Sequence, residues 1–261
     1  MIKTIPKSRL MIVVALSALC VAGATNAADW GSLKGRFVVD GKPADPPALL
    51  VDKDQFCIDK KPTNEAIILG EGNALVNAVV YLRVPRRGEV AIHPEYDAKL
   101  KTPVVLDNLG CSFHPRVTLV RVGQTLEVKN SDPTGHNTNI SLFGFNPVVP
   151  ANSKLDVKAA KDAPLPTPVR CNIHPFMVGH ILAQKHPYMT VSAEDGAFEI
   201  KNLPAGKHEI QLWHEVSGYL KDVVSKSGKA DRQGRLNVTV APNQTLDLGD
   251  IKVPASLLKV K

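Results

Sequence analysis

The chain has 261 residues, with 32 Lys and Arg against 25 Asp and Glu, which gives a formal net charge of +7. The surplus is spread along the sequence and lacks the aromatic-interleaved basic clusters of nucleic-acid binders, so no nucleic-acid partner is expected. Proline and glycine are frequent, at 20 and 18 residues, and patterns with a helical period are scarce. The composition therefore favours a β protein over a helical one.

The N-terminal segment has the parts of a secretory signal peptide. Basic residues precede an apolar stretch at residues 10–24, and Thr25 and Ala27 supply small residues at the positions that a signal peptidase reads. The apolar stretch is shorter than the roughly 20 residues of a membrane-spanning helix, so a cleaved peptide at residues 1–27 is favoured over an uncleaved anchor. Cleavage removes three basic and no acidic residues, which lowers the net charge from +7 to +4. We therefore expect a periplasmic or extracellular protein without a transmembrane segment in the mature chain.

The remaining sequence consists of short apolar runs separated by turn signals. Alternation with a period of two is clear at residues 236–240, and Asp195-Gly196 is a typical turn pair. The predicted strands are residues 35–40, 75–84, 118–122, 125–128, 197–200, 208–213, 236–240 and 246–253. Residues 159–168 contain three prolines and are expected to form an irregular connection. The pattern predicts an all-β protein, and the length fits two β modules better than one small sandwich.

Three cysteines remain after the signal peptide, namely Cys57, Cys111 and Cys171. An odd number of cysteines in an oxidising compartment leaves one thiol that needs an explanation. The simplest arrangement is a Cys57–Cys111 disulfide, with Cys171 kept as a metal-binding thiolate. On the chain-entropy model such a disulfide would stabilise the fold by roughly 4 kcal/mol.

One short segment carries the strongest chemical signal. Cys171, His174 and Met177 offer a thiolate, an imidazole and a thioether at three-residue steps, and His136 can supply a second imidazole from a separate loop. Two histidines, one cysteine and a weak axial methionine are the ligands of a type 1 copper centre. Imidazole suits Cu(II), whereas thiolate and thioether favour Cu(I), so the predicted site is a compromise between the two oxidation states.

Two other kinds of metal site compete with this prediction. One cysteine and two histidines with a water molecule would make a catalytic zinc site, but methionine is a poor zinc ligand and no well-placed Glu general base is evident. A binuclear copper centre would need a second bridging cysteine in the loop, and position 175 is Pro. The remaining histidines near the loops or on strands are not assigned a role: His114, His180, His186 and His214.

The Cys-x-x-His-Pro-Phe-Met pattern that starts at Cys171 resembles the ligand loop of the cupredoxins, and most closely the amicyanin type. Residues 122–130 and the His136-Asn137 step resemble the strand pair and the first ligand of the same family. The resemblance covers residues 103–186 and implies a Greek-key cupredoxin β-sandwich that binds one type 1 copper ion. It also implies that the Asn137 side chain ties the two ligand loops together.

The same resemblance implies an exported protein that transfers single electrons between redox partners and is not an enzyme. In cupredoxins the loop histidine breaks the surface, so electrons are expected to pass through the edge of His174, with Pro175 and Phe176 as an apolar docking rim. The expected partners are a periplasmic dehydrogenase, a cytochrome c or a terminal oxidase. The alternatives are a copper storage or delivery module, and a cell-envelope interaction protein whose metal site is incidental.

The segments on either side of this region resemble another family. Turn signals at residues 195–196 and 204–206 lead into successive strands, as in the carboxypeptidase regulatory-like domains. The resemblance covers residues 30–86 and 187–254 and implies a transthyretin-like β-sandwich with the copper-binding region inserted into it. It implies no peptidase activity, and a scaffold or partner-docking role is expected.

Overall fold

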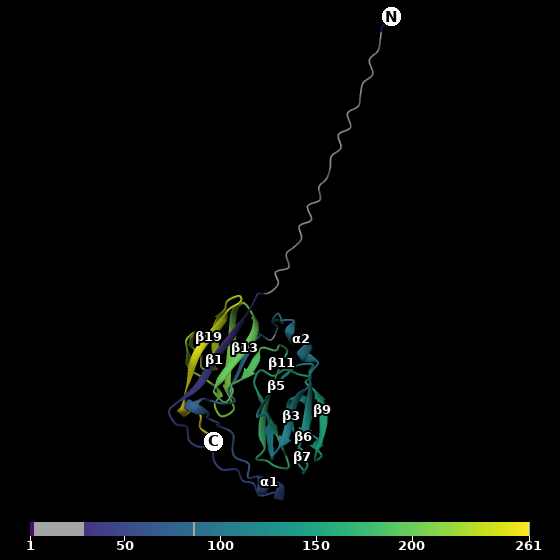
Figure 1. Ribbon diagram of the computed structural model, residues 1–261, viewed down its shortest axis with the longest axis vertical. Helices are drawn as coiled ribbons and strands as arrows, with labels where there is room; N and C mark the ends of the chain where they lie inside the picture. The colour runs from purple at the N-terminus through teal and green to yellow at the C-terminus, as the bar shows by residue number, and fades with distance from the viewer. Residues whose placement is uncertain (3–28, 86, 261) are drawn as a thin grey trace.

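The computed structural model describes residues 1–2, 29–85 and 87–260 (Figure 1). Apart from its first two residues, the predicted signal peptide lies outside these ranges. No helix within them is long and apolar enough to span a bilayer. The described chain is almost entirely β, which confirms the predicted fold class, and its strands form two modules.

The outer module is built from the first and last parts of the chain. Its strands are β1 (Trp30–Asp40), β2 (Val79–Arg83), β12 (Met189–Val191), β13 (Ala197–Pro204), β14 (Gly206–His214), β15 (Gly218–Tyr219), β16 (Val224–Ser225), β17 (Gly228–Lys229), β18 (Arg235–Val240) and β19 (Thr245–Pro254). One sheet has the order β13-β1-β19-β16-β17, and the other has the order β12-β2-β14-β15 with β18 beside β14. Phe37 and Leu248 from the first sheet share a buried core with Val80 and Ile210 from the second. The two sheets therefore form a sandwich, because each turns one face of its strands toward the other.

The inner module is formed by the middle of the chain. Its strands are β3 (Val104–Leu109), β4 (Ser112–His114), β5 (Val117–Arg121), β6 (Thr125–Asn130), β7 (His136–Asn137), β8 (Val148–Val149), β9 (Ser153–Lys158), β10 (Thr167–Arg170) and β11 (Val178–Gln184). They form the sheets β4-β3-β6-β9 and β10-β11-β5 and the short pair β7-β8. Leu106, Val128 and Ile181 from the two larger sheets belong to one buried core. The inner module is thus a second sandwich, and β7 lies at the end far from β13 (Figure 1).

Between β1 and β2 the chain leaves the outer module and crosses to the far end of the inner one (Figure 1). The short helices and 3-10 turns of the described chain are α1 (Gln55–Lys60), α2 (Glu95–Leu100), η1 (Glu71–Asn73), η2 (Ser141–Phe143) and η3 (Ala255–Leu257). Val51, Phe56 and Cys57 pack into the inner core. The predicted Cys57–Cys111 disulfide is present, with Cα atoms 5.6 Å apart. The predicted outer range 30–86 is therefore interrupted, because the disulfide holds α1 on the inner sandwich.

A third buried cluster joins the two sandwiches. It contains Val79, Tyr81 and Trp213 from the outer module and Val117 and Leu182 from the inner module. Beside this cluster, the guanidinium of Arg116 donates two hydrogen bonds of 2.7 and 2.8 Å to the carboxylate of Glu215. The two side chains are only 13% and 7% exposed, so the junction combines apolar contact with a buried ion pair.

Most predicted strands are observed with shifted ends. The predicted strand at 75–84 is extended only at Val79–Arg83, because Asn77 adopts a left-handed conformation with φ of 63° and ends the run before β2. The predicted irregular connection at 159–168 is shorter than expected. Its last two residues begin β10, which pairs with β11.

Candidate metal centre

The four predicted ligands lie in one buried region at the end of the inner sandwich. His136 is the first residue of β7, and the other three lie on the short connection between β10 and β11. The Met177 N–H donates to the His174 carbonyl at 2.9 Å, and the Cys171 N–H donates to the Met177 carbonyl at 3.3 Å. These backbone hydrogen bonds close the connection into a tight loop, so its side chains are held at fixed positions.

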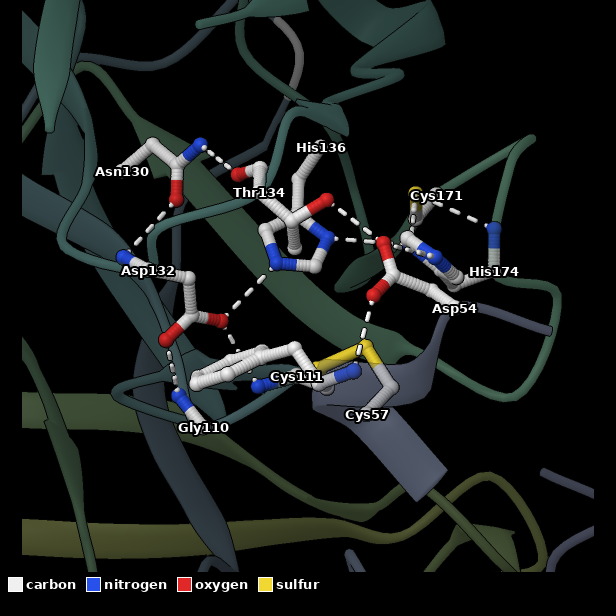
Figure 2. The surroundings of a disulfide bond; sticks show 11 residues. Asp54, Cys57, Gly110, Cys111, Asn130, Asp132, Thr134, His136, Cys171 and His174 are labelled. Atoms are coloured by element: carbon white, nitrogen blue, oxygen red, sulfur yellow. Dashed lines mark hydrogen bonds and ion pairs between the residues drawn. A yellow bond between two sulfur atoms is a disulfide. The ribbon is translucent and has the colours of Figure 1, made fainter. Parts of the chain in front are cut away.

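Donor atoms of His136 and of the free Cys171 both lie close to Nδ1 of His174 (Figure 2). His136 Nδ1 lies 3.0 Å from His174 Nδ1, and Cys171 Sγ lies 3.8 Å from the same atom. All three residues, like Met177, are no more than 1% exposed. Metal bonds of about 2.0 Å to imidazole and about 2.3 Å to thiolate, as in zinc sites, place the donors of one ion about 3–4 Å apart. Both distances from His174 Nδ1 fit donors of one ion. The donors that lie within 4.8 Å of one another are those of Cys57, His136 and His174, however, so Cys171 Sγ has to move toward His136 when an ion binds.

Cys171 is suited to be a thiolate ligand. It is the one cysteine outside a disulfide among those that the structure describes. Its Sγ accepts a hydrogen bond from the His174 backbone N–H at 3.3 Å, which holds the sulfur beside the histidine. Met177 is buried in the same core as Cys171 and is the remaining soft donor of the loop.

Another sulfur lies close to the two histidines. The possible ligand atoms of Cys57, His136 and His174 all lie within 4.8 Å of one another. Cys57 is bonded to Cys111, however, and a disulfide sulfur is not a thiolate. Cys171 therefore remains the thiolate available to the histidines within the described ranges.

A buried carboxylate contacts the far side of the His136 ring. Asp132 Oδ2 lies 2.8 Å from His136 Nε2, and the same side chain accepts hydrogen bonds from the N–H groups of Gly110 and Cys111 at 2.6 and 2.8 Å. A carboxylate only accepts, so Nε2 of His136 carries the proton and Nδ1 directs its lone pair toward the other donors. Asp132 was not among the predicted site residues, although a carboxylate four residues before a candidate ligand histidine is a usable signal.

A second carboxylate faces His174. Asp54 caps the N-terminus of α1 by accepting from the Phe56 N–H at 3.0 Å, and it also accepts from the Thr134 hydroxyl. The Thr134 hydrogen bond lowers the pKa of Asp54 below its ordinary value, against the opposing effect of burial. Asp54 Oδ2 lies 3.7 Å from His174 Nε2, too far for a hydrogen bond but near enough for attraction between a charge and an N–H dipole. Asp54 was not predicted either, because nothing in its local sequence points to a distant histidine.

The expectation that the edge of His174 breaks the surface is wrong. The side chain is 1% exposed, because Asp54 and Cys57 from the segment around α1 lie against its ring. Burial lowers the pKa of His174 below its ordinary value of 6.5, against the attraction of Asp54 and Asp132. The ring is therefore neutral near pH 7, which leaves a nitrogen lone pair free for a metal.

The predicted docking residues lie beside the covered histidine. Pro175 is exposed, and Phe176 is half-buried with its ring centroid 5.7 Å from that of His174. Ile173, on the other side of His174, is 41% exposed. The loop thus presents apolar groups to solvent, although the histidine itself does not reach it.

Asn137 links the two ligand loops. Its Oδ1 accepts a hydrogen bond from the Asn172 N–H at 3.0 Å, directly after Cys171. Its Nδ2 donates to the carbonyls of Asn146 and Pro147 at 3.1 and 3.0 Å. These contacts hold the β7 loop against the loop that follows β10.

The unassigned histidines lie away from these donors. His114 is exposed on β4. His180 lies at the junction, with Nδ1 3.7 Å from Glu215, and His214 ends β14 in the same region. His186 stacks on Tyr188 with ring centroids 5.8 Å apart.

No protein-family model matches the chain, and no curated protein sequence matches it. Among solved structures, amicyanin from Paracoccus versutus is similar with 17% identity, over 31% of this chain and 80% of that one, at a TM-score of 0.28. An oxidised mutant of amicyanin is similar with 18% identity, over 41% of this chain and 98% of that one, at the same TM-score. A copper-containing nitrite reductase from Thermus scotoductus SA-01 is similar with 25% identity, over 39% of this chain and 25% of that one, also at 0.28.

Proposed function

We propose that the protein is an exported type 1 copper protein that transfers single electrons and turns over no substrate, with copper held by His136, Cys171, His174 and Met177. The observation that carries the proposal is the burial of His136 Nδ1 and the free Cys171 sulfur at 3.0 and 3.8 Å from His174 Nδ1. Copper bound there would supply a couple between Cu(II) and Cu(I). Two soft sulfur donors beside two imidazoles suit copper better than zinc.

The surrounding residues keep the donor atoms in place. Asn137 joins the two ligand loops, and the His174 N–H fixes the Cys171 sulfur. The loop is short and closed by its own backbone hydrogen bonds. A fixed arrangement between the preferences of the two oxidation states requires little movement when an electron arrives or leaves.

We place partner docking at the apolar rim of Ile173, Pro175 and Phe176. These residues flank the covered His174, so a partner seated on them would lie one residue from a ligand. The net charge of +4 without the signal peptide favours a partner with an acidic surface, through faster encounter at low salt. A periplasmic dehydrogenase, a cytochrome c or a terminal oxidase fits this description, in the periplasm or outside the cell.

Loading with copper tests the metal assignment. We expect purified protein to bind one Cu(II) per chain and to turn intensely blue, through charge transfer from the Cys171 thiolate. Cys171→Ser and His136→Gln should remove the colour, measured as visible absorption per bound copper. His114→Gln is the matched control, because His114 is exposed outside the site. Colourless wild-type protein with one copper per chain would exclude a type 1 centre.

The burial of His174 beneath the segment around α1 favours a second candidate function, which is copper storage or delivery without electron transfer. A carrier has to exchange electrons through a surface close to its metal, and here the histidine edge lies beneath Asp54. Stopped-flow mixing of the Cu(I) protein with an oxidised cytochrome c separates the two functions. Fast electron transfer with copper retained supports the carrier, whereas loss of copper to a chelator before any electron transfer supports delivery.

We further propose that the outer module is a transthyretin-like scaffold, as the turn pattern at residues 195–206 implies. Two sheets with one shared core support this proposal. Its ion pair and apolar contacts with the inner module suit a role in holding the metal module at a fixed orientation.

A further inference from the structure

We propose that Asp132 and Asp54 are positioning residues of the metal centre, which orient the two histidine ligands from behind and lower the reduction potential of the bound copper. The inference rests on the proposed copper function and deepens it. Each histidine has one ring nitrogen directed at the other donors and the opposite nitrogen directed at a carboxylate (Figure 2).

Asp132 is held more firmly than an ordinary loop carboxylate. Gly110 and Cys111 form the two-residue turn between β3 and β4, with φ of 61° and 58°. In this turn both of their N–H groups point at the Asp132 side chain. With the carboxylate fixed in this way, its hydrogen bond at 2.8 Å fixes the plane and the proton position of the His136 ring.

Asp54 acts on His174 through charge rather than through a direct hydrogen bond. Its two oxygens are occupied by the Phe56 N–H and the Thr134 hydroxyl, and Oδ2 remains 3.7 Å from His174 Nε2. The side chain approaches from a segment that Cys57 ties to the inner module. Without a metal, the 3.0 Å contact between the two Nδ1 atoms requires His174 to donate from Nδ1 to His136. When a metal takes Nδ1, Asp54 stabilises the tautomer of His174 that carries its proton on Nε2.

The two carboxylates share one covalent support. Cys111 donates its N–H to Asp132, and its disulfide partner Cys57 lies in the helix that Asp54 caps. The two carboxylates face the ring nitrogens that do not bind the metal, and their negative charges make the imidazoles more basic. They also stabilise Cu(II) more than Cu(I), because Cu(II) carries the larger positive charge. The expected consequence is a lower reduction potential than the four ligands alone would give.

Voltammetry of Asp54→Asn tests the charge effect with little structural change. Asparagine caps a helix as well as aspartate does, so the contact with Phe56 is retained while the charge is lost. We expect the affinity for Cu(II), divided by the affinity for Cu(I), to fall several-fold. Voltammetry would record this change as a higher reduction potential. Asp52→Asn is the matched control, because it removes the same charge from an exposed position two residues earlier and should leave the potential unchanged.

Asp132→Asn should have the larger effect, a fall of about tenfold in the same ratio, which corresponds to a rise of 59 mV for a one-electron couple. This variant can fail to fold, because an amide would direct N–H toward the N–H of Gly110 or Cys111. The wild-type protein therefore provides an independent readout. Ring nitrogen NMR should place the proton of His136 on Nε2, both without metal and with Cu(I).

Potentials of Asp54→Asn and Asp132→Asn that match that of Asp52→Asn would overturn the inference, as would a His136 proton on Nδ1. A wild-type protein that never turns blue would instead refute the proposed function. The NMR measurement would still decide whether Asp132 orients His136, so the two failures are distinguishable.

Discussion

Three buried histidines outside the candidate metal centre make the fold sensitive to acid. Burial lowers the pKa of His186 to about 4. Burial and the nearby charge of Arg116 lower the pKa of His180 to about 3 and that of His214 to about 4. These rings stay neutral in the folded chain at pH values where they are protonated in the unfolded chain, below about 6.5. The unfolded chain then binds more protons, so acid favours unfolding.

We expect the free energy of unfolding of the metal-free protein to fall as the pH is lowered from about 6.5 to about 4. Each of the three histidines contributes up to about 1.4 kcal/mol per pH unit in this range. Urea denaturation across the range measures the slope, and His186→Gln should make it shallower. His114→Gln, at an exposed position, should leave it unchanged. Identical slopes in the wild type and both variants would contradict the assignment.

The axial ligand can be tested by itself. Met177→Leu should keep one copper per chain but raise the reduction potential, because a leucine side chain supplies no donor and a lower coordination number favours Cu(I). Voltammetry and the visible spectrum measure the change. Met189→Leu is a suitable control, since Met189 lies in β12 of the outer module. A Met177→Leu variant with the wild-type potential and spectrum would show that Met177 does not contact copper.

At the scale of single residues, the sequence predicts those candidate site residues that lie close together along the chain. The loop from Cys171 to Met177 could be predicted because its donors are three residues apart and a short turn brings such residues together. Asp132 was within reach of the same reasoning, since it precedes His136 by four residues. Asp54 was not, because its position depends on a helix cap, on Thr134 and on a disulfide at the same time.

At the scale of elements, α1 depends on its attachments. A helix of six residues is too short to be stable alone in water, so the Asp54 cap and the Cys57 disulfide have to hold it. The sequence predicts the disulfide from the cysteine count. It does not predict that the linked segment covers His174, because the path of a chain between two sandwiches is not encoded in local periodicity.

Removal of the disulfide should release this segment. We expect the Cys57→Ser, Cys111→Ser double variant to lose about 4 kcal/mol of stability, as the chain-entropy model gives for a separation of 54 residues. Hydrogen exchange at residues 55–60 should become faster than in the wild type, and a chelator should remove copper sooner. Unchanged exchange at these residues would show that Asp54 and the apolar contacts hold α1 without the disulfide.

At the scale of the whole molecule, the two sandwiches are joined by the Arg116–Glu215 pair and the apolar cluster beside it. Such contacts between distant strands could not be derived from the sequence, which predicts the strands but not their partners across modules. Both side chains of the pair are largely buried. Replacing either one with a neutral residue therefore leaves the charge of the other buried without a partner.

Glu215→Gln should therefore cost about 3 kcal/mol or more in the free energy of unfolding, because it leaves Arg116 buried without a countercharge. Urea denaturation measures the loss. Glu209→Gln is the matched control, since Glu209 pairs with Arg83 at 2.8 Å on an exposed face, where a pair contributes about 1 kcal/mol or less. Equal losses in the two variants would mean that the junction does not depend on this ion pair.

The insertion of one sandwich into the other also constrains the order in which the chain can fold. β3 to β11 are consecutive, so the inner sandwich can form as soon as its own residues are present. The outer sandwich cannot, because β1 pairs with β13 and β19, the last of which ends at Pro254. The first strand therefore lacks its first sheet partner until β13 is present, and its second partner is complete only at Pro254. The candidate metal centre lies on the inner sandwich, so its residues are brought together before the outer sandwich has closed.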